Sequence, residues 1–319
     1  MLDLTDRHCR YFHRQLSRHA RLYTEMLTTG ALLHGGADRH LRFDPVESPV
    51  ALQIGGSEPD ELARVARLGE SYGYDEINLN CGCPSERVQR GAFGACLMAE
   101  PRLVADCVRA MRDAVSLPVT VKHRIGLDRN EDYGFVRDFV GTLSDAGCEV
   151  FIVHARNAWL KGLSPKDNRE VPPLRYTTVT QLKRDFPQSI FVLNGGLTSL
   201  DVAEPHLPAV DGVMLGRAAY HDPYLLADVD RRLFDGTEQS SRREIVARMN
   251  AYLVREAESG TSPRHVVRHM LGLYQGVRGA RQWRRFLSDP DALAADPRML
   301  LTRALAWVEP ADALATALD

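Results

Sequence analysis

The sequence predicts an α/β fold: a (β/α)8 barrel whose first strand is missing from this chain, followed by an all-helical region. Two observations lead to this expectation. Apolar strand-like segments alternate with helical patterns up to residue 216, and only helical patterns remain from residue 242. Continuous apolar strands between helices are typical of a parallel sheet covered on both faces. We therefore expect a barrel domain at 1–236 and a helical domain at 242–319, joined by a polar linker.

Seven segments have the composition of buried strands, whereas a closed barrel of this class needs eight. The chain begins directly before a helical segment at 6–18, so the absent strand is the first. An open doubly wound sheet would explain the same count. The barrel is preferred because of the glycine turns that follow the last two strands. The segments are 21–26, 50–55, 76–79, 119–125, 150–155, 190–194 and 212–216.

These turns read Asn194-Gly195-Gly196 and Gly216-Arg217. Backbone N–H groups after the seventh and eighth strands, each at the start of a helix, are where barrel enzymes bind phosphate groups. Arg217 adds a charged donor. No Walker A or G-x-G-x-x-G pattern is present, so a dinucleotide site of the Rossmann type is disfavoured.

Polar side chains interrupt four of the apolar strands close to their carboxyl ends. A buried lysine or histidine is unfavourable unless it is paired, and each residue alone is most simply a satisfied core group. Together they converge on the face where barrel enzymes keep their active sites. They would suit a flat ring with hydrogen-bond acceptors and a phosphate tail. The residues are Gln53, Asn78, Asn80, Lys122, Arg124 and His154.

One loop contains a candidate reactive thiol. Cys83 lies between Gly82 and Pro84, just past the strand at 76–79, and loops on a rigid scaffold often carry chemistry. A surface turn with an incidental cysteine is the alternative. The six cysteines include no C-x-x-C pair, which argues against a zinc site and fits free thiols in a reducing compartment. We therefore expect no metal and a cytoplasmic location.

The net charge is −2, but basic residues are unevenly distributed. Residues 242–285 contain ten Arg or Lys and three acids, whereas residues 289–319 contain two and six. A basic block in one segment is typical of a face that binds a polyanion, although solvated helix faces give the same pattern. Arg281, Arg284 and Arg285 share one helix face. No apolar run reaches the roughly 20 residues that a membrane helix needs, so we expect no membrane partner.

Eight segments spread over nearly the whole chain carry specific motifs: TDRHCR (5–10), EINLNCGCPSERVQ (76–89), GACLM (94–98), VTVKHRIG (119–126), FIVHARNAWLKGLSPKDNRE (151–170), NGG (194–196), DGVMLGRAAY (211–220) and HMLGLYQGVRGARQWRRF (269–286). They resemble the tRNA-dihydrouridine synthases, most closely the A-type subgroup that acts at positions 20 and 20a of the tRNA D-loop. The resemblance implies a barrel that binds FMN, a helical tRNA-binding domain, and NADPH or NADH as electron donor. We expect a monomer.

The reaction that the resemblance implies is the reduction of uridine to 5,6-dihydrouridine, with hydride passing from the flavin to C6 and a proton from Cys83 to C5. A thiol is a workable acid near neutral pH, and a cation stabilises an anionic reduced flavin. The implied flavin contacts are Met1, Gln53, Lys122, Arg124, His154, Asn194, Gly195, Gly196, Gly216 and Arg217. The implied tRNA contacts are Asn80, Lys166, Arg169, Arg281 and Arg284.

Two features depart from the family pattern. Cys81 stands where an aliphatic residue is usual, and the chain begins at the Met that ends the family's first strand. We therefore expect the 319-residue chain to retain FMN poorly or to aggregate. Two other functions stay open. One is a flavin oxidoreductase of small pyrimidines, similar to dihydroorotate dehydrogenases, which leaves the Arg-rich helical region unexplained. The other is a catalytically silent tRNA-binding protein.

Overall fold

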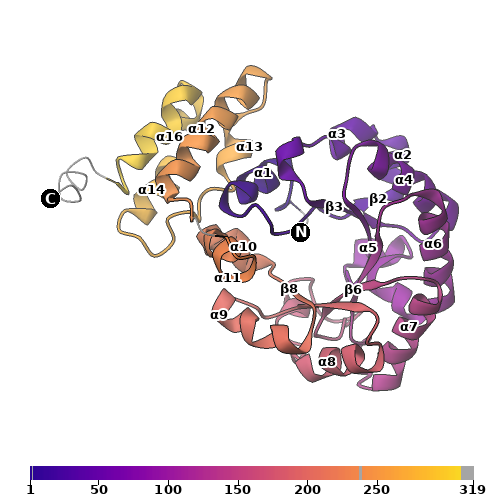
Figure 1. Cartoon of the computed structure of the whole chain (residues 1–319). Coiled ribbons are helices and arrows are strands. Elements are labelled where there is room, and N and C mark those ends of the chain that lie inside the picture. Colours follow the sequence, from indigo (N-terminus) through magenta and orange to yellow (C-terminus); the bar gives the residue numbers. More distant parts are fainter. Residues whose placement is uncertain (2, 237–238, 310–319) are drawn as a thin grey trace. The chain divides into compact units, whose positions relative to one another are not determined.

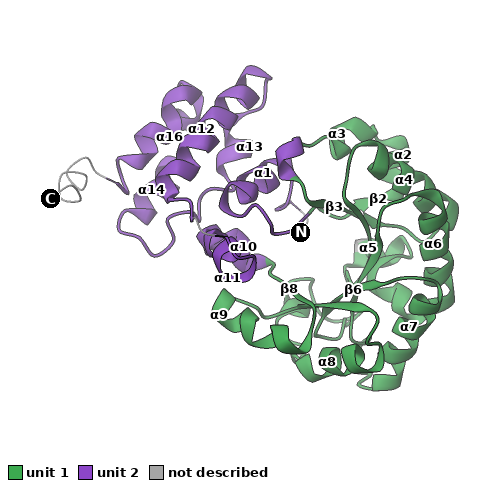
Figure 2. Ribbon diagram, in the orientation of Figure 1, with its two compact units in different colours: residues 1–2, 23–43, 48–216 green, residues 3–22, 44–47, 217–319 purple. Residues whose placement is uncertain are grey.

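A computed structural model of the chain describes residues 1, 3–236 and 239–309. These residues form two compact units (Figure 2). Unit 1 comprises residues 1, 23–43 and 48–216, and unit 2 comprises residues 3–22, 44–47 and 217 onward. The first helix therefore belongs to the same unit as the C-terminal helices, which a boundary between residues 236 and 242 does not anticipate.

The division into a catalytic domain and a tRNA-binding domain stays a prediction. The two units are defined by how densely their residues pack, which does not show what each unit binds. Residues 237–238 of the expected linker and residues 310–319 of the expected helical domain lie outside the described residues.

Unit 1 is a curled parallel sheet with helices along its outer side (Figure 1). Along the described residues the sheet has the order β1-β3-β4-β5-β6-β7-β8, with β2 also paired to β3, and its end strands β1 and β8 do not pair with each other. The expected parallel α/β sheet of the barrel type is confirmed. The strands are β1 (Leu22–Tyr23), β2 (Leu27–Thr28), β3 (Val50–Gly55), β4 (Glu76–Cys81), β5 (Val119–Arg124), β6 (Val150–His154), β7 (Ile190–Asn194) and β8 (Gly212–Met214).

The single strand expected at 21–26 is instead two short strands that both lie beside β3. Thr24 explains the interruption. Its backbone N–H donates to the carbonyl of Ala51 at 3.0 Å, but its side-chain hydroxyl, and not a backbone carbonyl, accepts the N–H of Gln53 at 2.9 Å. A side chain that takes a backbone partner competes with the regular ladder, so the strand is broken at this point.

The strands of unit 1 have an apolar outer face that packs against helices. Gly69 of α4 lies so close to β3 and β4 that a Cβ on it would stand 2.8 Å from Leu52 and 2.6 Å from Ile77. The helical segments are α2 (Thr29–His34), α3 (Ala37–Leu41), α4 (Pro59–Ser71), α5 (Glu86–Arg90), η2 (Gly94–Ala99), α6 (Pro101–Ala114), α7 (Tyr133–Asp145), η3 (Asp167–Arg169), α8 (Tyr176–Asp185), α9 (Leu200–Ala203) and η4 (Glu204–Ala209).

Unit 2 is helical in its described residues, which confirms the helical character expected beyond residue 242. Trp283 is fully buried at its centre and donates from Nε1 to the carbonyl of Met270 at 3.0 Å. The helical segments are α1 (Arg7–Leu16), η1 (Pro45–Glu47), α10 (Arg217–His221), η5 (Pro223–Asp228), α11 (Val229–Leu233), α12 (Arg242–Glu258), α13 (Pro263–Val267), α14 (Ala280–Phe286), α15 (Pro290–Ala294) and α16 (Pro297–Leu305).

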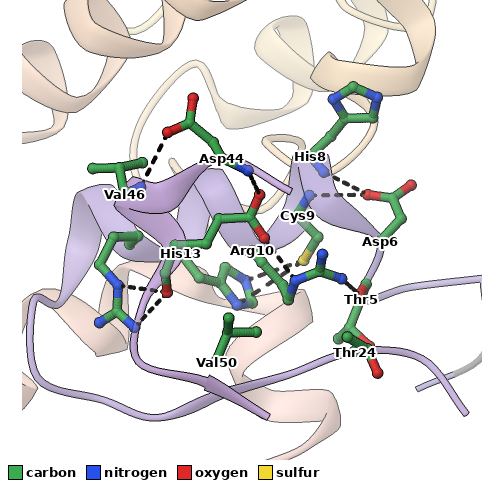
Figure 3. Close-up of polar contacts among 12 residues, drawn as sticks. Thr5, Asp6, His8, Cys9, Arg10, His13, Thr24, Asp44, Val46 and Val50 are labelled. Atoms are coloured by element: carbon green, nitrogen blue, oxygen red, sulfur yellow. Dashed lines mark hydrogen bonds and ion pairs between the residues drawn. The ribbon is translucent and has the colours of Figure 1, made fainter. Parts of the chain in front are cut away.

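Helix α1 is held in unit 2 by charged and polar contacts (Figure 3). Asp6 caps the helix by accepting the N–H groups of His8 and Cys9, both at 3.0 Å. Arg10 pairs with Glu47 at 2.7 Å, and both side chains are almost completely buried. Because a buried charge is tolerated only when it is paired, this ion pair fixes α1 against η1.

Candidate active site at the carboxyl ends of the strands

The loop after β4 holds Cys83 in a defined position. Asn80 accepts the backbone N–H groups of Gly82 and Cys83 at 3.0 and 2.9 Å, and the carbonyl of Cys83 accepts the N–H of Ala95 at 2.9 Å. A Cβ on Gly94 would lie 2.6 Å from that carbonyl, at a φ of +78°, so only glycine allows the return contact. The Cys83 thiol is half-buried and lies 3.6 Å from the hydroxyl of Ser85, the N-cap of α5.

The other thiols have surroundings that suppress reactivity. Burial raises the pKa of Cys81 well above its usual range, and burial also raises the pKa of Cys96. Cys9 lies 3.6 Å from the ring of His13 in unit 2, but this pair is not a catalytic dyad. Burial raises the pKa of the Cys9 thiol and lowers that of His13 to about 3, so both groups are neutral. Cys81, the extra cysteine at the end of β4, is therefore a neutral, buried thiol.

A chain of buried polar groups supports the loop from below. Gln53 donates to Asn78 at 2.8 Å and accepts from Asn80 at 3.0 Å. Asn78 donates to Thr120 at 2.8 Å, and Thr120 donates to Glu76 at 2.6 Å. Because every side chain in this buried network has a hydrogen-bond partner, the network is stable. It fixes the Asn80 side chain, which in turn binds the backbone of Cys83.

Cations meet at the ends of the neighbouring strands. The sheet register places Asn80 beside Lys122 and Arg124 beside His154. Among the described residues, Lys122 donates to the amide oxygen of Asn194 at 3.2 Å and to no carboxylate. Burial, together with the charge of Arg124, lowers the pKa of Lys122 to about 8. Burial also lowers the pKa of His154 well below its usual range, so this ring is neutral.

Arg124 joins three segments of the site. Its Nε donates to the carbonyl of Gly82 at 3.1 Å, and its Nη1 donates to the carbonyls of Asn157 and Asn168 at 3.1 and 2.9 Å. Burial lowers the pKa of Arg124 to about 10. Arg124 thus places a buried cation beside the backbone of the Cys83 loop, through the Gly82 carbonyl.

The turn after β7 has the form of an anion site. Gly195 and Gly196 have φ angles of +110° and +70°, and a Cβ on Gly195 would lie 2.5 Å from the His154 ring. The hydroxyl of Tyr176 donates to the carbonyl of Gly195 at 2.7 Å. This hydrogen bond fixes the orientation of the peptide group between Gly195 and Gly196. Successive backbone N–H groups in such turns bind anions. This turn, with the neighbouring cations, fits a phosphate-bearing cofactor.

The turn after β8 lies beside Met1. A Cβ added to Gly216 would meet the Met1 sulfur at 3.7 Å, which is an ordinary van der Waals contact. Arg217 follows directly and begins α10. The expected cofactor residues of unit 1 thus lie on β3, β5, β6 and β7, in the turns after β7 and β8, and at Met1.

The expected tRNA contacts lie in different settings. Lys166 and Arg169 are exposed at η3 in unit 1, and Arg281 and Arg284 are exposed on α14 in unit 2. Asn80 is 8% exposed, and its amide is engaged with the Cys83 loop and with Gln53. In this structure it organises the loop, and a contact to tRNA would add to that role.

Sequence reasoning missed two residues of this region, Gln89 and Asn168. Gln89 bridges the Cys83 loop and the segment after β6 by donating to the carbonyls of Pro84 and Leu160, both at 2.8 Å. Asn168 is fully buried and holds the backbone of Trp159 through hydrogen bonds of 2.7 and 2.9 Å. The partners of both side chains are backbone atoms. Because backbone atoms are the same in every residue, no sequence pattern predicts these contacts, and only the folded chain shows them.

The family model described as dihydrouridine synthase (Dus) matches residues 1–305 of the chain. The chain belongs to the dihydrouridine synthase family. Similar relatives named tRNA-dihydrouridine(20/20a) synthase include proteins of the following three bacteria. That of Pseudomonas putida is 58% identical over 96% of this chain and 91% of its own. That of Escherichia coli K12 is 59% identical over 91% and 84%, and that of Salmonella typhimurium is 57% identical over 97% and 93%.

Solved structures support the fold of this family member. A 2-naphthoyl-CoA reductase has a TM-score of 0.53 at 12% identity, covering 72% of this chain, which spans about half (47%) of that protein. Morphinone reductase in complex with tetrahydroNAD has a TM-score of 0.50 at 12% identity, over 76% of this chain and 86% of its own. At such identities the likeness shows the barrel-type fold alone.

Membership in the dihydrouridine synthase family makes this chain an oxidoreductase. The family uses a flavin with a nicotinamide-type donor, which agrees with the glycine turn and the cations described above. Among the described residues no helix has the length and apolarity to span a membrane, and no cluster of His, Cys, Asp and Glu could hold a metal ion.

Proposed function

We propose that this protein reduces uridine to 5,6-dihydrouridine at positions 20 and 20a in the D-loop of tRNA. The family membership and the names of the relatives support the reaction and its position. The observation that carries the proposal is the placement of Cys83. A half-buried thiol is fixed through its own backbone at the carboxyl edge of the sheet, where Arg124 donates to the carbonyl of the neighbouring Gly82 at 3.1 Å.

The proposed cofactor is FMN, with NADPH or NADH as the donor. When bound, the flavin supplies the hydride that the uracil ring receives at C6. The turn at Gly195 and Gly196 is suited to the phosphate of FMN, and Lys122 is suited to negative charge on the flavin ring. The proposed contacts are Met1, Gln53, Lys122, Arg124, His154, Asn194, Gly195, Gly196, Gly216 and Arg217.

Cys83 has one task in the proposed reaction, which is to hold a proton at Sγ and give it to C5 of the uracil. Hydride at C6 and a proton at C5 together saturate the C5–C6 double bond, so atoms and electrons balance. The thiolate left behind has a cation close by, since Arg124 donates to the carbonyl of the neighbouring Gly82 at 3.1 Å, and solvent returns the proton before the next turnover. Asn80 and Ala95 keep the sulfur in place during the transfer.

The tRNA is proposed to be held mainly by electrostatic contacts. Exposed cations that suit phosphate groups occur in both units, and Asn80 is proposed as a contact beside Cys83. A base must leave its stack to reach the thiol, which costs a few kcal/mol and is offset by such contacts. The proposed cations are Lys166, Arg169, Arg281 and Arg284. A cytoplasmic, monomeric protein is part of the same proposal.

The test is complementation of a bacterial strain that lacks its own enzyme for positions 20 and 20a. We expect wild-type protein to restore dihydrouridine there and Cys83→Ala to lower the rate about 100-fold or more, because general acids contribute roughly that much. Cys96→Ala is the matched control, since it removes another half-buried thiol close in sequence. Full modification by Cys83→Ala would refute the role of this thiol, and none by wild-type protein would refute the reaction.

A further inference from the structure

Gln89 connects the Cys83 loop with the segment after β6. It lies on α5, five residues beyond Pro84, and its single amide nitrogen donates to two carbonyls, those of Pro84 and Leu160, at 2.8 Å each. Pro84 adjoins Cys83, whereas Leu160 is 71 residues from Gln89 in the sequence. The side chain therefore spans two loops that are independent along the chain.

The segment after β6 that Gln89 reaches is itself tied together by hydrogen bonds. The N–H of Leu160 donates to the Asp128 carboxylate at 2.8 Å, and the neighbouring Trp159 is held by the buried side chain of Asn168. The same segment carries Lys166 and Arg169, the proposed tRNA contacts in unit 1. A change in the position of this segment is thus transmitted to Leu160 and from there to Gln89.

A second tie runs beside the first. Arg124 donates to the carbonyl of Gly82 and also to the carbonyls of Asn157 and Asn168. Gly82 and Pro84 are the two neighbours of Cys83, so each side of the thiol is joined to the segment after β6 by one side chain. Gln89 is neutral and is not among the proposed cofactor contacts, so it can be altered without changing the charge of the site.

We propose that Gln89 is a positioning residue that couples the segment 157–169 to Cys83. This inference rests on the proposed function and adds one element to it. Binding of tRNA to Lys166 and Arg169 fixes the position of segment 157–169. The two hydrogen bonds of the Gln89 amide then fix Pro84, and with it the neighbouring thiol, relative to this segment. The physical basis is that one amide nitrogen donates to a carbonyl in each of the two loops. These two hydrogen bonds hold the loops at a fixed distance from each other.

The test separates the two halves of the catalytic cycle in purified holoenzyme. With Gln89→Ala, we expect reoxidation of the reduced flavin by tRNA to slow by about 10- to 100-fold, because a misplaced reacting group costs roughly that much. Reduction of the flavin by NADPH and the Kd for tRNA should stay within about twofold of wild type. A role in general stability alone would affect both halves together or neither.

A second variant tests whether the donors or the shape of Gln89 matter. Gln89→Glu keeps the size of the side chain but removes both N–H donors, and we expect it to be as slow as Gln89→Ala near neutral pH. Its reoxidation rate, relative to wild type, should rise as the pH is lowered toward the pKa of a glutamic acid, about 4.3 in a model peptide. The protonated carboxyl then offers one O–H donor again.

Gln181→Ala is the matched control, because Gln181 is exposed on α8. We expect it to react with tRNA at the wild-type rate. Wild-type rates of reoxidation in Gln89→Ala, or a Gln89→Glu variant that is fully active at neutral pH, would overturn the coupling. Such results leave the proposed function intact, whereas a wild-type enzyme that fails to modify tRNA would refute the function itself.

Discussion

Replacing Lys122 by methionine is expected to make the flavin-free protein more stable, although it damages the site. Lys122 is a cation in a neighbourhood that contains Arg124, and its one hydrogen bond in the described chain goes to the neutral amide of Asn194. Burial of a charge without a carboxylate partner opposes folding. Methionine has a similar length and no charge, so Lys122→Met removes the charge while largely preserving the packing.

The magnitude follows from the pKa of Lys122. A fall from 10.5 to about 8 corresponds to roughly 3 kcal/mol of folding free energy, since one pKa unit is worth about 1.4 kcal/mol. The variant also loses the hydrogen bond to Asn194, which contributes about 1 kcal/mol. We therefore expect the free energy of unfolding to rise by about 2 kcal/mol at pH 7.

The pH dependence gives a sharper test than the magnitude. Below pH 8 Lys122 is protonated in both the folded and the unfolded chain, so the whole advantage of Lys122→Met is present. Between pH 8 and pH 10.5 the folded wild type loses its proton while the unfolded chain keeps it, and wild-type stability rises relative to the variant. The advantage of the variant should therefore shrink across this range.

Urea unfolding of the flavin-free proteins at pH 7 and at about pH 10 measures both effects. Lys161→Met is the control, since an exposed lysine should change stability by less than about 0.5 kcal/mol. A variant that is less stable than wild type at pH 7, or an advantage that is the same at both pH values, would refute the reasoning. We also expect weaker FMN binding in Lys122→Met than in Lys161→Met.

Two further substitutions test the glycine turn and the anchoring of α1. Gly195→Ala places a Cβ 2.5 Å from the His154 ring at a φ of +110°, so it should lower stability by about 1–3 kcal/mol and weaken FMN binding. Fluorescence titration with FMN checks this, and unchanged affinity and Tm would contradict it. Glu47→Ala leaves Arg10 buried without its carboxylate, but burial raises the pKa of Glu47 to about 7, so part of the cost is offset and urea unfolding should show a loss of about 1–2 kcal/mol. A loss below about 1 kcal/mol would show that water or another group replaces the pair.

Much of the sheet and part of the site could be predicted because their signals are local. The strands from β3 to β8 are short apolar runs, and burial on both faces of a parallel sheet requires such runs wherever the chain enters it. Cys83 stands out because glycine and proline flank it after a strand. Lys122, Arg124 and His154 stand out because a polar residue inside an apolar strand needs a partner.

Other parts could not be predicted because their partners are distant in sequence or are backbone atoms. Thr24 breaks a strand only because the N–H of Gln53 lies within reach of its hydroxyl. Gln89 and Asn168 look like ordinary surface amides until the chain folds and carbonyls come within 3 Å of them. The packing of α1 with the C-terminal helices depends on pairs that are distant in sequence, Arg7 with Glu256 and His8 with Tyr252.

The sequence alone thus determined the class of fold and the family, and it marked Cys83 as the candidate thiol, because each of these depends on residue types and spacings within single segments. The tertiary structure decided how the thiol is held. Asn80 and Ala95 fix the backbone of Cys83, and Gln89 and Arg124 tie its two neighbours to the segment after β6. These contacts are hydrogen bonds, which depend on distances near 3 Å and on direction, and such geometry exists only once distant segments have packed together.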